Sequence, residues 1–196
     1  ARVGALDIGF TANGVDAILN HGGKLKVVFL AGADDISTKA LADTFSVYVG
    51  SHGDHGVAHA DVILPAAAYA EKPGTWVNME GRVQRGYRAV FAPGEAREDW
   101  SIYRALSDVL GVTLPYDNID ALRARIAAEW PHLGSEGLTA SAWGDFGGDA
   151  KLEGGAIRLP VTNFYTTNAI ARASETMAEC VAQILNGHEP ALQAAE

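Results

Sequence analysis

Three short apolar runs stand out in the first third of the chain. Residues 25–31 and 45–49 are rich in β-branched and aromatic side chains, and residues 62–64 form a third run that ends at Pro65. A continuous apolar run of this length is typical of a strand covered on both faces of a sheet, and proline ends the ladder because it has no N–H donor. The pattern therefore predicts three buried strands.

Segments with helical spacing lie around these runs. The apolar positions of residues 36–44 predict a short helix between the first two strands, and those of residues 15–19 predict an earlier helix that ends at Gly22-Gly23. A strand, a helix and then two further strands is the order of a right-handed parallel α/β layer. The predicted fold class is therefore α/β.

A β-hairpin is predicted immediately after the third strand. Pro73-Gly74 suits the central positions of a type II turn, and residues 78–81 suit a type I turn in which Gly81 supplies the left-handed bulge. Residues 75–77 and 82–84 would then be the two arms of the hairpin.

Three longer helices are predicted in the second half of the chain. Residues 99–110 are followed by Gly111, residues 119–130 are followed by Pro131, and residues 168–187 begin at an asparagine that is a candidate N-cap. The predicted inward stripes are Ile102, Leu106 and Val109; Ile119, Leu122, Ile126 and Trp130; and Ile170, Met177, Val181 and Ile184.

Residues 134–155 have no periodic pattern and are rich in Gly, Ser and Asp, so we expect an irregular surface excursion that Trp143 and Phe146 hold in place. The change of character after the hairpin predicts two parts. Residues 1–92 would form the α/β part, and residues 93–196 would form a helical, irregular C-terminal extension packed on it.

The composition narrows the class of protein. With 196 residues, 48% hydrophobic residues and 22 glycines, the chain can bury one globular core. A net charge of −9 without any basic cluster argues against nucleic-acid binding. No apolar run reaches the roughly 20 residues of a membrane-spanning helix. Because Cys180 is the only cysteine, the chain cannot by itself supply the ligands of a cysteine-bound iron–sulfur cluster.

The segment from residue 60 to 84, ADVILPAAAYAEKPGTWVNMEGRVQ, closely resembles a motif of the molybdopterin oxidoreductase superfamily. The form of the motif resembles the large iron–sulfur subunit (the G subunit, of the 75 kDa type) of respiratory NADH:quinone oxidoreductase, complex I. Residues 27–35, 93–117 and 163–181 extend the resemblance over nearly the whole chain. Formate-dehydrogenase-like members usually carry a second arginine at the position of Gly81, which favours the complex I branch.

This resemblance implies a three-layer, parallel-sheet molybdopterin-oxidoreductase-like domain fragment without a cofactor. The [2Fe–2S] and [4Fe–4S] clusters of the full subunit would lie upstream of Ala1, in a longer polypeptide of which this is the C-terminal piece. The partners would be other peripheral-arm subunits of complex I in a hetero-oligomer, without nucleic acid. The location would be peripheral, on the cytoplasmic face of the bacterial inner membrane or the matrix face of the mitochondrial one.

Three histidines form the best candidate metal constellation. His52, His55 and His59 lie with Asp54 and Asp61 in a glycine-rich loop after the second strand, and imidazoles at short spacing can converge on zinc. Open α/β sheets bind ligands at this end of their strands, and in molybdenum-containing relatives the loop lies near the pterin. The spacing is unspecific, so the favoured interpretation is a structural loop.

The remaining candidate residues favour structural interpretations. Asp34 and Asp35 follow a strand, but no G-x-G-x-x-G motif precedes them, so helix capping is preferred to nucleotide binding. Cys180 is interpreted as a buried small side chain. Glu71, Lys72, Glu80 and Arg82 could act as acid–base pairs, but an ion-pair lattice that fixes the hairpin is preferred. No catalytic, cofactor-binding or metal-ligating residue is therefore predicted in this segment.

The leading hypothesis is a structural, cofactor-free part of the large complex I subunit. The first alternative is a fragment of a molybdopterin-dependent formate dehydrogenase or nitrate reductase, with the histidine loop on the pterin. The second is a stand-alone metal- or nucleotide-binding α/β module. Metal analysis separates the three, because molybdenum with pterin fluorescence would indicate the first alternative and stoichiometric zinc the second.

Overall fold

The computed structural model describes residues 2–10, 14–20, 22–33, 36, 41–53, 55–137, 139–140, 154–155 and 161–187. The chain divides into two compact units, Ala1–Thr139 and Ala140–Glu196. The predicted division into residues 1–92 and 93–196 is a different partition and stays a prediction.

The three apolar runs form a parallel sheet in the first unit. Its strands are β1 (Val27–Ala31), β2 (Phe45–Gly50) and β3 (Val62–Pro65), in the order β1-β2-β3. Both strand pairs are parallel, with Val27 opposite Phe45 and Val47 opposite Val62. The three predicted strands are therefore confirmed, and the first begins two residues later than predicted.

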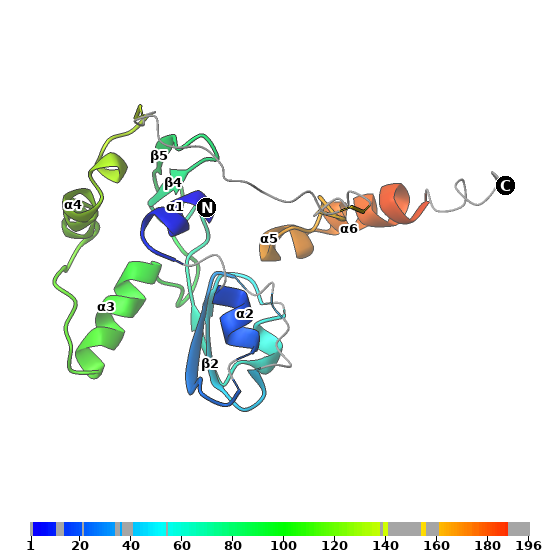
Figure 1. Cartoon of the computed structure of the whole chain (residues 1–196), viewed down its shortest axis with the longest axis horizontal. Helices are drawn as coiled ribbons and strands as arrows, with labels where there is room; N and C mark the ends of the chain where they lie inside the picture. The colour runs from blue at the N-terminus through cyan, green and yellow to red at the C-terminus, as the bar shows by residue number, and fades with distance from the viewer. Residues whose placement is uncertain are drawn as a thin grey trace. The chain divides into compact units, whose positions relative to one another are not determined.

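A helix covers each face of this sheet, α2 (Gly14–Leu19) on one side and α3 (Asp99–Val109) on the other (Figure 1). On the α2 side, Val28, Leu30, Leu41 and Tyr48 form a buried cluster against which Ile18 packs. On the α3 side, Val47, Val49 and Ala66 are buried, and Ile102 and Tyr103 pack against them. Alternate residues of β2 supply both clusters, which confirms the three-layer α/β fold.

The prediction that the third strand is covered on both faces is wrong for this chain. β3 lies at the edge of the sheet, with β2 as its only strand neighbour among the described residues. Ile63 is 50% exposed, whereas every residue of β2 from Ser46 to Val49 is buried. A central strand is covered by its neighbours and by both helices, and an edge strand is not.

Most of the predicted helix over residues 36–44 lies outside the described residues.

The predicted hairpin is confirmed as β4 (Gly74–Val77) and β5 (Val83–Gly86). The N–H of Gly81 donates to the carbonyl of Asn78 over 3.1 Å, as a β-turn requires. The Asn78 side chain accepts hydrogen bonds of 2.9 Å from the N–H groups of Glu80 and Arg82. Gly81 has φ of +79°, the left-handed conformation predicted for the bulge.

The predicted type II turn at Pro73-Gly74 is wrong, because Gly74 does not have the positive φ that such a turn needs. Gly74 instead begins β4 and lies opposite Gly86. A Cβ atom would lie 3.2 Å from Trp76 Nε1 at Gly74 and 2.9 Å from it at Gly86. Both glycines therefore make room for the Trp76 indole on one face of the hairpin.

Replacing Gly81 with valine should lower the free energy of unfolding by about 1–2 kcal/mol, because a β-branched residue resists positive φ. A Cβ atom at Gly81 meets nothing within 4 Å, so the loss would come from the backbone alone. Chemical denaturation measures it, with Glu80→Val as the control at the exposed neighbouring position. Equal stability of the Gly81→Val protein and the wild type would contradict this assignment of the turn.

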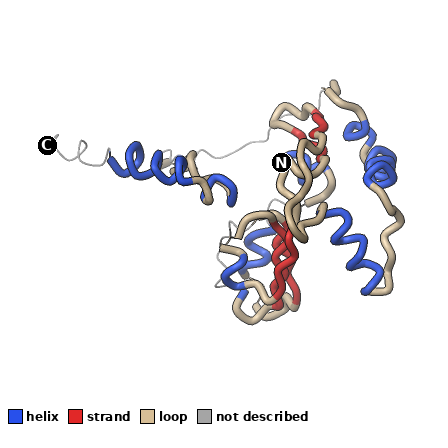
Figure 2. The backbone as a smooth tube through the Cα atoms, turned by 180° about the vertical axis from the view of Figure 1, so that it is seen from behind, coloured by secondary structure: helices blue, strands red, loops and turns tan. Residues whose placement is uncertain are grey.

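The hairpin has its own small core, separate from the parallel sheet (Figure 2). Val77 and Val83 are buried with Leu133, and Ile126 and Trp130 pack against them. Ile126 comes from α4 (Ile119–Glu129), Leu133 comes from the 3-10 helix η3 (Pro131–Gly134), and Trp130 lies between the two; α1 (Arg2–Asp7) contributes Val3. The backbone of Val83 also exchanges two hydrogen bonds with Gly137, of 2.9 and 2.8 Å.

The two middle helices lie where the sequence predicts them. Gly111, with φ of +77°, ends α3, and the Asn118 side chain caps α4 by accepting from the N–H of Ala121 over 2.8 Å. The α3 stripe is only partly confirmed, because Ile102 and Leu106 are half-buried but Val109 is 84% exposed. Val109 lies in the last turn of α3, beyond the region that packs on the sheet.

The prediction of one continuous C-terminal helix is wrong. Asn168 caps its start as predicted, but the helix is divided into α5 (Ala169–Arg172), α6 (Glu175–Cys180) and the π-helical turn η4 (Val181–Leu185). The break has a local cause, because Ser174 takes an extended backbone and its side chain accepts from the N–H of Met177, which starts a new helix. Ile170 and Ile184 are exposed, so the predicted inward stripe is not buried within this unit.

Candidate functional site

A cleft of about 350 Å³ lies at the carboxyl ends of β2 and β3, where open α/β sheets place their ligands. Its polar side chains are Ser51, His52, Glu71 and Glu95, and its floor includes Pro65 and Ala66. The predicted position of the loop at this end of the sheet is therefore confirmed.

Tyr48 holds the start of the histidine-containing loop that follows β2, and its side chain lies on the buried side of the sheet. Its hydroxyl donates a hydrogen bond to the carbonyl of His52. Gly50 makes this possible, since a Cβ atom there would lie 2.5 to 2.8 Å from the end of the Tyr48 ring. The glycine is thus needed for close approach of a side chain and not for a positive φ.

The three histidines and Asp61 do not form a single group. His52 follows β2, whereas the Asp61 carboxylate accepts a 2.7 Å hydrogen bond from the N–H of Ser46, at the opposite ends of the strands. His59 ends the 3-10 helix η2 (Val57–His59) between β2 and β3. Within the described part of the chain, no group of three or more His, Cys, Asp or Glu side chains could hold a metal ion. Asp54, Asp34 and Asp35 lie outside the described residues.

The predicted ion-pair lattice around the hairpin is only partly correct. Lys72 forms an ion pair with Asp99 at the start of α3, and Glu71 accepts a 2.9 Å hydrogen bond from the N–H of Ala68. Among the described residues, Glu80 and Arg82 form no ion pair with one another. Both side chains are exposed at the tip of the turn, and the turn is stabilised instead by hydrogen bonds to the Asn78 side chain.

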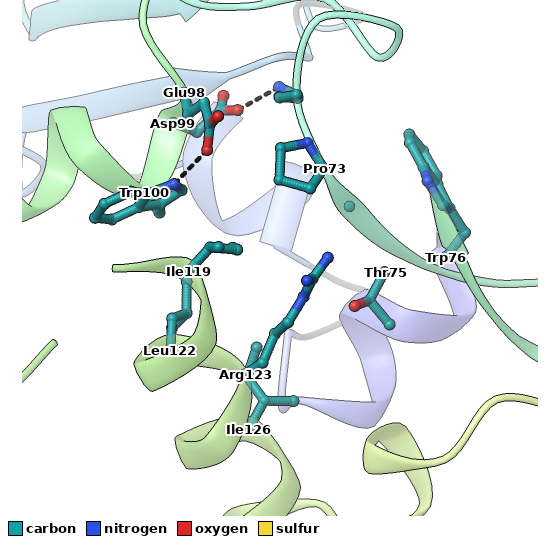
Figure 3. A pocket seen from close by; sticks show the side chains of 12 residues that line it. Pro73, Thr75, Trp76, Glu98, Asp99, Trp100, Ile119, Leu122, Arg123 and Ile126 are labelled. Atoms are coloured by element: carbon teal, nitrogen blue, oxygen red, sulfur yellow. Dashed lines mark hydrogen bonds and ion pairs between the residues drawn. The ribbon is translucent and has the colours of Figure 1, made fainter. Parts of the chain in front are cut away.

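A second cleft, of about 310 Å³, was not predicted from the sequence (Figure 3). It lies between the hairpin and α4, and the start of α3 forms part of its rim. Pro73, Trp76, Ile119, Leu122 and Ile126 give it apolar walls. The Glu98 carboxylate on its rim accepts a 2.5 Å hydrogen bond from Trp100 Nε1, and the Arg123 guanidinium points into it.

An exposed charge network connects the end of α3 with the turn before α4. Arg104 donates to Asp117 over 2.8 Å and pairs with Asp108, and Thr113 donates to Asp108 over 2.6 Å. The hydrogen bonds from Thr113 and then from Arg104 lower the pKa of Asp108 below its ordinary 3.8. The same carboxylate raises the pKa of Arg104. The network holds the connection between the two helices and has no evident chemical role.

Cys180 ends α6 and is half-buried, so it is less buried than predicted. Trp143 and Phe146, predicted to hold the irregular excursion in place, lie outside the described residues.

Comparison with known families places two domains in succession along the chain. Residues 1–109 match the molybdopterin oxidoreductase family. Residues 130–180 match the C-terminal domain of the NADH-ubiquinone oxidoreductase G subunit. The first match contains both the parallel sheet and the hairpin.

Three curated relatives align with nearly the whole chain. The mitochondrial NADH-ubiquinone oxidoreductase 78 kDa subunit of Candida albicans is 42% identical over 92% of this chain and 26% of its own length. The 75 kDa subunit of Reclinomonas americana is 44% identical over 92% of this chain and 27% of its own length. The mitochondrial 78 kDa subunit of Neurospora crassa is 42% identical over 93% of this chain and 25% of its own length. The chain thus spans about a quarter of the length of these relatives.

Proposed function

The chain belongs to the molybdopterin oxidoreductase family and also carries the C-terminal domain of the NADH-ubiquinone oxidoreductase G subunit, and on this premise we propose that it is a structural part of the large subunit of that enzyme. In this role it contributes to electron transfer from NADH to quinone by holding the peripheral arm together. The chain itself performs no reaction.

The observation that carries this proposal is the succession of the two domains. A molybdopterin oxidoreductase domain alone would suit a molybdenum enzyme equally well, but here the G-subunit domain follows it, and relatives named as 75 and 78 kDa subunits align over both. The single cysteine supports a structural role, because an iron–sulfur cluster takes several cysteine ligands. We propose that the clusters of the enzyme are bound by the rest of the full-length subunit.

The proposed partners are other subunits of the peripheral arm. In the described part of the chain, no helix has the length and apolar character needed to cross a membrane. We therefore propose that membrane association comes through those partners. The proposed location is the cytoplasmic face of a bacterial inner membrane or the matrix face of a mitochondrial one.

Replacing His52, His55 and His59 together with glutamine in the full-length subunit should leave NADH oxidation by quinone nearly unchanged, since the described residues contain no group of three or more His, Cys, Asp or Glu side chains that could hold a metal ion. The measurement uses the purified enzyme, with metal analysis of the wild type and the variant side by side. Molybdenum and pterin fluorescence lost with the histidines would instead indicate a molybdenum enzyme. A loss of zinc equimolar with the chain would indicate a metal-binding module.

A further inference from the structure

An apolar groove of about 590 Å³ lies between α3 and the edge strand β3. Leu64 of β3 lines it, together with Ile102, Leu106 and Val109 of α3. Among the described residues no further strand follows β3 in the sheet, so this flank of the sheet has no cover of its own.

The groove is open to solvent. Val109 is 84% exposed, and Ile63 on the same edge strand is 50% exposed. Natural proteins usually cover or charge the edge of a sheet, and a continuous exposed apolar surface usually marks a protein contact. We therefore looked for the kind of segment that would complete this surface.

The charge of the groove narrows the choice. Arg97 is its only ionisable lining residue within the described structure, and it is exposed. Its Nη1 donates to the carbonyls of Ala96 over 3.0 Å and Gly94 over 3.5 Å, and it forms no ion pair with any described residue. Carbonyl oxygens do not neutralise its charge, and a guanidinium pairs best with a carboxylate. The groove therefore suits an apolar segment that carries a carboxylate near the Arg97 end.

The backbone of Arg97 favours a helix over a further strand. Its N–H donates to the Pro65 carbonyl over 3.1 Å and its carbonyl accepts from the Ala67 N–H over 2.8 Å, so it already occupies the outer side of the sheet where β3 ends. β3 has only four residues, so few backbone groups remain for pairing. From Ser101 to Val109 the lining of α3 extends about 12 Å, a little over two helical turns. An amphipathic helix with apolar residues at positions i, i+4 and i+7 fits a groove of this length.

The rest of the same polypeptide is the source that we favour for this helix. The chain spans about a quarter of the length of the relatives that it matches. A segment of the same polypeptide is present at high effective concentration, so it can dock on a groove of modest size. We propose that an amphipathic helix from the rest of the full-length subunit docks in this groove, with a carboxylate on Arg97 and its apolar face on Leu64, Ile102 and Val109. This rests on the proposed function, which makes the chain part of a longer subunit.

Photo-cross-linking identifies the occupant directly. Benzoylphenylalanine in place of Val109 is introduced into the full-length subunit, which is purified without its partner subunits and irradiated. Mass spectrometry should find a cross-link to a segment of the same polypeptide outside residues 1–196, with apolar residues at helical spacing and at least one Asp or Glu. The same label in place of Val112 is the matched control, because Val112 is 76% exposed but does not line the groove. It should not cross-link to that segment.

Val109→Lys should lower the urea midpoint of the full-length subunit, because it places a charge in an apolar contact. It should not lower the midpoint of the 196-residue chain, in which Val109 is exposed. Val112→Lys should lower neither midpoint. Arg97→Glu should lower the midpoint of the full-length subunit more than Arg97→Gln does, because it opposes the carboxylate of the docked helix with a like charge.

Three results would overturn the proposal. The first is the absence of any cross-link from position 109 in the full-length subunit. The second is a cross-link that forms only in the assembled enzyme and reaches a different subunit. The third is an equal urea midpoint of Val109→Lys and the wild type in the full-length subunit. None of these results would touch the proposed function, which would fail instead if the wild-type protein contained molybdenum or stoichiometric zinc.

Discussion

Replacing Tyr48 with alanine is expected to lower the free energy of unfolding by about 3–5 kcal/mol, the usual cost of deleting a buried aromatic ring. The side chain is only 3% exposed and packs with Val28, Leu30 and Leu41 between the sheet and α2. Its hydroxyl also holds the carbonyl of His52 in the loop after β2. The substitution therefore creates a cavity under the sheet and releases the loop at its carboxyl end.

Urea unfolding of the chain, followed by tryptophan fluorescence, measures this loss. Tyr69→Ala is the matched control, because Tyr69 is 63% exposed and its replacement should change the free energy by less than about 0.5 kcal/mol. Tyr48→Phe should fall between the two, at about 0.5–1.5 kcal/mol, since it removes only the hydrogen bond. If Tyr48→Ala were no less stable than Tyr69→Ala, the position of β2 at the centre of the sheet would be wrong.

The features that the sequence predicts correctly depend on nearby residues. The hairpin turn depends on Asn78 and Gly81, which are three residues apart and determine the turn whatever packs around it. The end of α3 at Gly111 and the cap of α4 are local in the same sense. The Ser174 cap that breaks the last helix is also local, but a serine within an apolar periodic pattern is equally compatible with a continuous helix.

The features that the sequence does not predict depend on contacts between distant residues. Gly86 is required by the indole of Trp76 on the opposite strand, because a Cβ atom at Gly86 would lie 2.9 Å from Trp76 Nε1. The exposure of β3 depends on how many strands join the sheet. The second cleft combines Lys72 from the loop before β4, Asp99 from α3 and Arg123 from α4, and in the sequence these are only scattered charges.

The C-terminal unit provides the strongest test of a structural role. Its larger apolar side chains remain exposed within the unit: Val161, Phe164, Ile170 and Ile184. Met177 and Val181 are only half-buried. Burial of one such side chain contributes roughly 1.5–3 kcal/mol, so a surface of this kind can contribute substantially to association once it is covered. Under the proposed function, neighbouring protein surfaces of the enzyme would cover it.

Truncating the subunit before Asn168 should therefore lower the amount of assembled enzyme several-fold. The reason is that losing a few kcal/mol of association free energy is enough to lower the abundance of the assembled enzyme at least several-fold. A variant carrying Glu179→Ala and Gln183→Ala loses only an exposed 2.8 Å hydrogen bond and should assemble normally. Electron paramagnetic resonance of the truncated enzyme, normalised to flavin, should show unchanged iron–sulfur signals, since Cys180 alone cannot ligate a cluster. Normal assembly with one cluster signal missing would contradict the structural role and indicate a cofactor bound by this region.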